Sequence, residues 1–155
     1  MKAFTVESTK QFMSKFLGSE VFDDFLLEEA SIKTFNTFTI DGRIVPEFYD
    51  DYEFGYEFST WQTLRPVCFD LIKGKQAPVA CHFVLQLKPE KIVELLKENN
   101  SSIDPELIRS FTLNVKYLNG EVTLITATST TTFVMDKTPD EIWDKYIEDF
   151  IKANA

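Results

Sequence analysis

The sequence predicts an α+β fold in which helices pack on one face of an antiparallel sheet. Three observations support this prediction: segments that alternate apolar and polar residues, two Asx-Gly pairs of the kind that join adjacent strands, and amphipathic segments that begin with helix caps. No repeat of 20 to 50 residues, Gly/Ser linker or long block of like charge divides the chain. We therefore expect residues 1–155 to form a single domain.

The chain begins with a short strand, expected over residues 3–7, and a helix. Ser8 and Gln11 have the spacing of a capping box, in which each side chain meets a main-chain amide of the other. Gly18 is suited to the left-handed conformation that ends a helix. These signals predict a first helix over residues 9–17.

Residues 32–40 then alternate with the period of two that is typical of a strand. Asp41 and Gly42 are the pair that a two-residue hairpin turn prefers, so we expect a hairpin centred on them. Its return strand ends at Pro46, which has no amide to donate.

A second extended region is expected over residues 67–87. If Gly74 and Lys75 form a two-residue turn, Cys68 faces Cys81 across the two strands. Pro78 favours a longer loop, so this register is left open.

The last third of the chain contains two further helices and a hairpin. Pro89 can open the second helix, and Asn119-Gly120 is the strongest hairpin signal in the sequence. Thr138 and Glu141 form another capping box, followed by a broad apolar stripe at helical spacing. A terminal helix of this kind is expected to pack on the sheet.

Charge and cysteine content exclude several classes of function. The chain has 16 basic and 25 acidic residues, a net charge of −9, which argues against a general electrostatic grip on nucleic acid or on an anionic membrane. It has two cysteines, no signal-peptide pattern and no long apolar run. We expect a cytoplasmic protein that does not enter the membrane.

Motifs for catalysis or metal binding are missing from the sequence. It contains no GxGxxG, GxxxxGK[ST], GxSxG or HExxH pattern, and His82 is the only histidine. The sequence therefore favours a protein that is not an enzyme, with no catalytic residues, no metal and no cofactor.

Residues 47–58 have the most unusual composition, with six aromatic and five acidic residues among twelve. Their carboxylates could hold a hard cation, but the spacing of a calcium loop is missing. The aromatics could instead pack down beneath solvated acids, which is the structural alternative. The region could also form an interaction surface together with the residues just after it. The candidate residues for this surface are Tyr49, Tyr52, Phe54, Tyr56, Phe58, Trp61 and Arg65.

Apart from the terminal helix, the expected elements follow the order strand-helix-strands twice. This order resembles that of one domain of the bacterial DNA sliding clamp. The local likeness lies in the segments Lys2–Glu7 and Phe83–Lys91, each of which leads into a helix. The chain also resembles small uncharacterised proteins of anaerobic Gram-positive bacteria. The clamp resemblance implies that the helices face DNA, and the candidate DNA-facing residues are Lys2, Lys10 and Lys15.

The resulting hypothesis is a binding or assembly module for a protein partner on a clamp-like fold. An alternative fold is the helix grip, in which a curved sheet wraps the terminal helix around a cavity. It implies an alternative function, binding of a small molecule in an apolar cavity under that helix. Weak association with DNA through the first helix is a third hypothesis, and the oligomeric state is left open.

Overall fold

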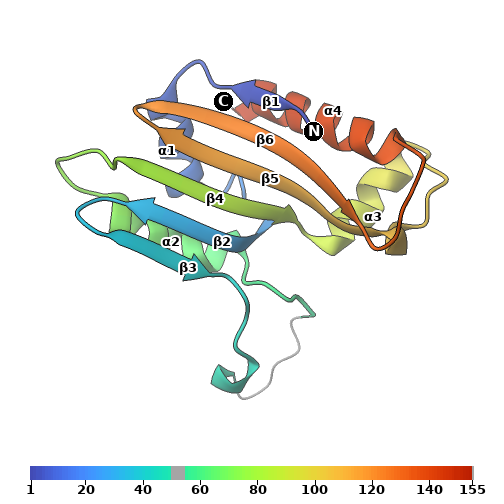
Figure 1. Ribbon diagram of the computed structural model, residues 1–155, viewed down its shortest axis with the longest axis horizontal. Coiled ribbons are helices and arrows are strands. Elements are labelled where there is room, and N and C mark those ends of the chain that lie inside the picture. Colours follow the sequence, from blue (N-terminus) through green and yellow to red (C-terminus); the bar gives the residue numbers. More distant parts are fainter. Residues whose placement is uncertain (50–54, 155) are drawn as a thin grey trace.

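Six strands form one antiparallel sheet in the computed structural model, which describes residues 1–49 and 55–154. The strands are β1 (Ala3–Thr5), β2 (Phe25–Lys33), β3 (Thr37–Asp41), β4 (Ala80–Leu87), β5 (Ile108–Leu118) and β6 (Glu121–Thr130). Across the sheet they lie in the order β1-β6-β5-β4-β2-β3. The first strand of the chain therefore pairs with the last one at one edge of the sheet (Figure 1).

The helices lie on one side of this sheet. In the described ranges they are α1 (Thr9–Gly18), α2 (Trp61–Ile72), α3 (Pro89–Glu98) and α4 (Thr138–Asn154). Figure 1 shows them behind the strands, with α3 near one end of the sheet. None of these helices is long and apolar enough to cross a membrane. The arrangement confirms the predicted α+β class with helices on one face.

Two fully buried tryptophans fill the space between helices and sheet. The Trp61 ring stacks on Phe16 at 4.4 Å between centroids, and its indole nitrogen donates to the main-chain carbonyl of Phe16 at 3.1 Å. The Trp143 ring stacks on Phe111 at 5.2 Å, and its nitrogen donates to the carbonyl of Thr112 at 2.9 Å. The helix side of the sheet is therefore a packed aromatic core.

Local signals predicted several element ends correctly. The Ser8 hydroxyl accepts from the Gln11 amide at 3.2 Å, as predicted, and α1 ends at Gly18, one residue after the predicted end. The left-handed conformation expected of Gly18 is wrong, because this glycine belongs to the helix and Ser19 caps it in an extended conformation. Asn119 and Gly120, with φ of 52° and 81°, take the left-handed conformation that the tight turn between β5 and β6 requires. In each case the signal depends on neighbouring residues alone.

The hairpin predicted at Asp41-Gly42 is wrong. Strands β2 and β3 pair as a hairpin with Lys33 opposite Thr37, so its turn lies at residues 34–36. Asp41 is the last residue of β3 and lies opposite Glu29 of β2. The Asp-Gly pair thus marks the end of a strand.

Gly42 is needed for a close approach between backbones. Its amide donates to the carbonyl of Glu28 at 2.8 Å, and its carbonyl accepts from the amide of Ser59 at 2.8 Å. A Cβ at this position would lie 1.8 Å from the carbonyl oxygen of Leu27. The glycine therefore fits because it has no side chain.

The extended region predicted over residues 67–87 is wrong in its first half, which belongs to α2. Thr60 caps this helix through its hydroxyl, which accepts a main-chain amide of the first turn. Pro66 lies inside the helix, where it removes one main-chain hydrogen bond, so the sequence pattern did not indicate a helix. Burial of Trp61 against the core holds the helix despite this loss.

The cysteines consequently do not face each other across a hairpin. Cys68 lies in α2 and Cys81 in β4, where Ile32 and Tyr117 are its strand partners. Both thiols are free and buried. They belong to the packing between helix and sheet.

The element order contains a strand, a helix and two strands twice, as β1-α1-β2-β3 and β4-α3-β5-β6. The unexpected α2 separates these units, and α4 follows the second. This order agrees with the repeat noted in the sequence. The likeness to a sliding-clamp domain stays a prediction.

Candidate functional site

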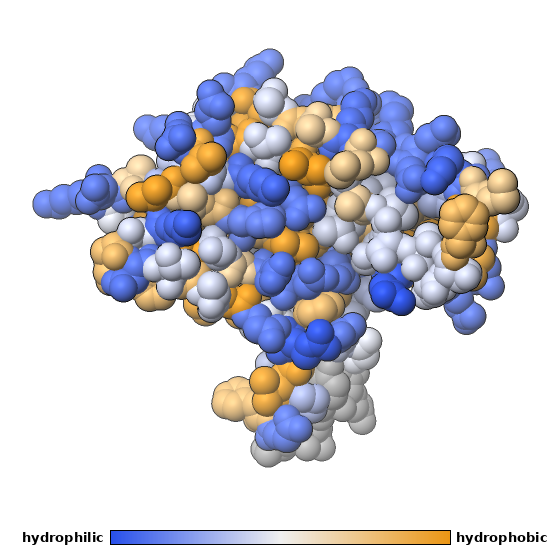
Figure 2. All heavy atoms as spheres, viewed as in Figure 1, coloured by the Kyte–Doolittle hydropathy of each residue, from blue (hydrophilic) through white to orange (hydrophobic). Residues whose placement is uncertain are grey.

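The sheet face opposite the helices is uncovered in the described part of the chain. Strand pairing arranges its side chains in rows across the sheet. One row contains Thr5, Thr123, Lys116, His82, Ser31 and Thr39, and the next contains Ala3, Ile125, Asn114, Val84, Glu29 and Asp41. Figure 2 looks onto this face and shows hydrophilic residues with apolar ones between them. Such a face is stable in water and accessible to a partner.

A groove of about 550 Å³ lies on this face over β2, β3 and β4; we call it the acidic groove. It is lined by Glu28, Glu29, Ala30, Ser31, Thr39, Ile40, Asp41, Arg43, Phe58 and His82. Three carboxylates thus face one guanidinium, that of Arg43, which pairs with the Glu57 carboxylate at 2.6 Å. The groove is therefore a negatively charged surface.

An irregularity in β2 explains why two consecutive acids reach the acidic groove. The pairing of β2 with β4 shifts between Leu27 and Glu29, which leaves Glu28 without a partner in β4. Consecutive residues of a regular strand point to opposite faces, and a bulge breaks that alternation. The Glu28 carboxylate accepts from the Gln86 amide group at 2.6 Å. Glu28 and Glu29 consequently line the same groove.

The only histidine is held by a hydrogen bond within the uncovered face. Its Nε2 lies 3.0 Å from the Asn114 side-chain oxygen, which joins His82 of β4 to β5. The Asn114 amide nitrogen in turn donates to the carbonyl of Ile125 at 3.5 Å. These contacts fix the imidazole at the side of the acidic groove. Across the described ranges, no three His, Cys, Asp or Glu residues are placed to hold a metal ion.

The structure divides the predicted interaction surface between interior and exterior. Trp61 is fully buried, and Phe58 is 7% exposed beneath the Arg43 guanidinium, which lies 5.4 Å from its ring centre. Arg65 forms a partly buried ion pair with Asp23. These three predicted residues therefore stabilise the fold, and in this conformation Trp61 offers no surface to a partner.

Other members of the predicted interaction surface lie outside the core. Tyr49 is partly exposed, and the Tyr56 hydroxyl donates to the Glu90 carboxylate. Desolvation, together with this hydrogen bond, raises the pKa of Tyr56 to about 12. Tyr52 and Phe54 lie outside the described residues, as do three of the acids considered as cation ligands.

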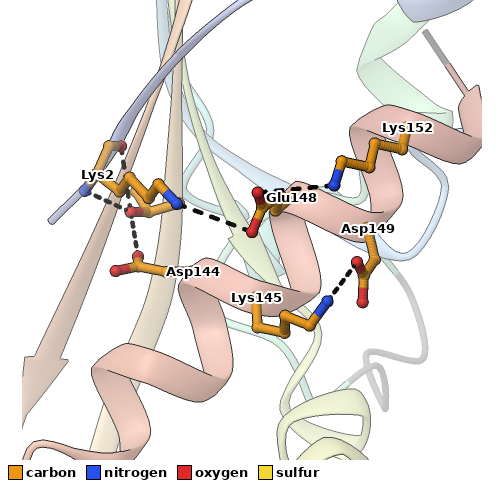
Figure 3. A network of polar contacts seen from close by, with 7 residues as sticks. Lys2, Asp144, Lys145, Glu148, Asp149 and Lys152 are labelled. Carbon is orange, nitrogen blue, oxygen red and sulfur yellow. Dashed lines mark hydrogen bonds and ion pairs between the residues drawn. The ribbon is translucent and has the colours of Figure 1, made fainter.

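Lys2, one of the three candidate DNA-facing residues, fastens β1 to α4. Its main-chain nitrogen donates to the Thr126 hydroxyl at 2.9 Å, and its ammonium group lies 3.8 Å from Glu148 (Figure 3). The Thr126 hydroxyl also lies 2.5 Å from a carboxylate oxygen of Asp144, to which it donates. The positive charge of Lys2 is thus offset by acids of α4.

The other two candidate lysines lie on α1. Lys15 donates to the main-chain carbonyl of Asn154 at 2.8 Å, which joins α1 to the end of α4. Lys10 is exposed on the same helix. Lys15 therefore lies at the end of the acidic terminal helix.

The space under α4 is filled, but an open groove of about 540 Å³ lies beside its C-terminal half. This groove is lined by Phe4, Val6 and Ile151 among apolar residues, with Glu148 and Lys152 at its charged side. Trp143, stacked between Phe111 and Tyr146, occupies the place where the helix-grip hypothesis expected a cavity. A small molecule would therefore have to bind beside the helix, against β1.

Burial of the two thiols predicts a loss of stability at alkaline pH. Desolvation raises the pKa of Cys68 from 9.0 to about 12, with a contribution from Cys81, and desolvation raises that of Cys81 to about 11. Because the folded pKa values lie above the unfolded ones, this stability is fully present below about pH 9 and is lost as the pH rises toward the folded values. The free energy of unfolding should fall by up to about 1.4 kcal/mol per pH unit for each thiol.

Urea unfolding at a series of pH values between about 8 and about 11 tests this expectation. The double variant Cys68→Ala, Cys81→Ala should show a shallower decline, although its absolute stability falls because of the cavities. An equal decline in the variant and the natural protein would contradict the assignment of the effect to the thiols.

Sequence reasoning missed the acidic groove. Glu28 and Glu29 lie in β2, Asp41 ends β3 and Arg43 follows it, so their proximity depends on strand pairing. The available signal was the doublet Glu28-Glu29 within an apolar strand, which breaks the period of two. Of the described members of the predicted interaction surface, Phe58 is the one that lines the groove.

Comparisons with known proteins give a family but no function. No curated protein and no solved structure shows significant similarity to the chain. A family model described as a family of unknown function, DUF5721, matches residues 15–155, which include the acidic groove and α2 to α4. The chain therefore belongs to the DUF5721 family.

Proposed function

We propose that this protein is a cytoplasmic binding module without enzymatic activity, and that the acidic groove receives a basic segment of a partner protein. The observation that supports the proposal best is the excess of carboxylates in a groove on an uncovered sheet face. Lysine and arginine side chains complement such a surface, and electrostatic attraction also accelerates the encounter. The uncovered rows of the sheet provide further accessible surface around the groove.

Residues of the predicted interaction surface contribute to this site in a different way from that expected. Phe58 forms an apolar part of the groove, with Arg43 above it. Tyr49 and Tyr56 lie in the connection that follows β3, beside Thr60 and Thr63 at the start of α2, and are not part of the acidic groove. Trp61 and Arg65 hold α2, which follows that connection, through their contacts with Phe16 and Asp23.

Photocrosslinking and charge reversal test the proposal together. A photoreactive residue at Thr39, inside the acidic groove, should capture a partner in cells, whereas the same residue at the exposed Gln62 of α2 should not. The affinity of that partner for the purified protein should then fall about tenfold or more when Glu29 and Asp41 are both replaced by lysine.

Glu20→Lys is the matched control, because this acid is exposed and lies outside the groove. The control should leave the affinity unchanged apart from a weak long-range effect that salt removes. Equal crosslinking from Thr39 and Gln62, or an affinity that the double reversal does not change, would refute the acidic groove as the binding site.

The alternative of a small-molecule binder rests on the groove beside α4. Its volume of about 540 Å³ lies within the usual range for ligand sites, and Phe4, Val6 and Ile151 give it apolar lining. Binding there should be abolished by Ile151→Glu and left intact by the charge reversals in the acidic groove. Titration with a fluorescent apolar probe distinguishes the two sites.

A further inference from the structure

Two connections at one end of the sheet are rich in lysine. Residues 30–40 and 71–86 contain three lysines, Lys33, Lys73 and Lys75, and no acidic residue, although the whole chain has a net charge of −9. The main chain brings these segments together, because the amide of Val79 donates to the carbonyl of Lys33 at 2.8 Å. The β2-β3 turn and the α2-β4 connection thus form one basic end.

An apolar groove of about 410 Å³ lies at this end; we call it the basic groove. It is lined by Thr34, Phe35, Leu71, Ile72, Lys73, Gly74, Lys75, Gln76, Ala77 and Val79. The Phe35 ring is 86% exposed at its rim. Lys73 pairs with Asp70 at 3.1 Å, whereas Lys75 forms no ion pair with another described residue. A segment that combines an aromatic ring with carboxylates would complement this surface.

The chain itself carries such a segment. A single 3-10 turn, Pro46–Phe48, follows β3; we call it the acidic turn. Phe48 is 83% exposed and lies directly after Glu47, and the sequence beyond continues with further acids. Figure 1 shows that this turn projects from the sheet, away from the β2-β3 turn of the same molecule. The acidic turn and the basic groove are therefore available to different copies of the chain.

We propose that the acidic turn of one copy docks in the basic groove of a second copy. Phe48 enters beside Phe35, Leu71 and Val79, where it loses its exposure to water, and Glu47 lies near Lys75. Charge complementarity selects this occupant, because Lys73 and Lys75 line the groove and Glu47 is next to Phe48 in the turn. The surface is separate from the acidic groove, so the inference goes beyond the proposed function.

Sedimentation velocity over protein concentrations up to about 1 mM tests the association. The average mass should rise with concentration, and the rise should weaken when the ionic strength increases from about 0.05 M to about 0.5 M. A turn variant, Glu47→Lys with Phe48→Ser, and a groove variant, Phe35→Ser with Lys75→Glu, should each weaken self-association about tenfold or more. Both sets of positions are exposed, and circular dichroism checks that each variant stays folded.

Mixing the two variants provides the decisive arm of the experiment. The turn variant keeps an intact basic groove and the groove variant keeps an intact acidic turn, so their mixture should associate more strongly than either variant does alone. Phe133→Ser with Met135→Ser is the matched control, because these residues are 83% and 82% exposed in a different connection. It should associate like the natural protein. A natural protein that stays monomeric, variants that associate normally, or a mixture that stays monomeric would each overturn the proposal.

Discussion

Replacement of Gly42 by alanine is expected to destabilise the protein by about 3 kcal/mol or more. The added methyl carbon would lie 1.8 Å from the Leu27 carbonyl oxygen and 2.9 Å from that of Glu28, and both are main-chain atoms that cannot rotate away. Relief of the clash requires β2 and the end of β3 to separate. This movement breaks the hydrogen bonds that Gly42 makes with Glu28 and Ser59. Urea unfolding of the purified variant measures the loss.

Gly18→Ala is the matched control for this prediction. No atom lies within 4 Å of the position that its Cβ would occupy, and alanine is a better helix former than glycine. Its free energy of unfolding should stay equal to that of the natural protein or rise slightly. If Gly42→Ala were as stable as Gly18→Ala, the close approach of the backbones at Gly42 would be wrong.

Trp61→Ala should cost about 3–5 kcal/mol, which is a large part of the stability of a domain of this size. The substitution removes a fully buried ring that stacks on Phe16 and packs edge-on against Phe83. It also leaves the main-chain carbonyl of Phe16 without the indole donor. Denaturant unfolding, or thermal unfolding where the variant is marginal, measures the effect.

The neighbouring exposed residue provides the comparison for Trp61. Gln62→Ala changes the next position of α2 and should alter the stability by less than about 0.5 kcal/mol. A role of Trp61 in binding alone would predict an unchanged stability and a reduced affinity for the partner. The structure predicts a large loss of stability, and any loss of binding should follow the fraction of unfolded protein.

The elements that the sequence predicted correctly are those with local causes. The cap at Ser8 and the turn at Asn119-Gly120 each depend on side chains and backbone angles within a few residues. The start of α4 was placed correctly, but Thr138 is its first residue and not its cap, and the Thr138 amide donates to the Asp136 carboxylate. Amphipathic stripes in α3 and α4 likewise identify the face that is buried. The α+β class follows from these elements together.

The elements that were predicted wrongly depend on contacts between distant residues. Pro66 normally interrupts a helix, and only burial of Trp61 beneath α1 makes α2 stable around it. Asp41-Gly42 has the composition of a turn, but the conformation of Gly42 is determined by its main-chain hydrogen bonds with Glu28 of β2 and with Ser59. Neither contact leaves a signal within its own segment.

Only the edge of the acidic groove, at Phe58, was predictable from the sequence. The unusual composition of residues 47–58 drew attention to the region beside the acidic groove, and Phe58 belongs to both. The carboxylates of the groove come from two strands, and their convergence depends on the register of β2 with β3 and on the bulge after Leu27. Strand register across such distances is not encoded in a short window of sequence.

The attachment of β1 to β6 implies an order of events during synthesis of the chain. The hydrogen bond between Lys2 and Thr126 joins residues that are 124 positions apart, so the ribosome makes β1 long before its partner strand. Contacts between residues so far apart in the sequence require a large loss of chain entropy to close the loop, and they form late in folding. The β5-β6 hairpin provides the template on which the N-terminal strand docks, and α4 then fastens that strand through Glu148. The sheet is thus completed by β1, a strand that is synthesised long before the strand it pairs with.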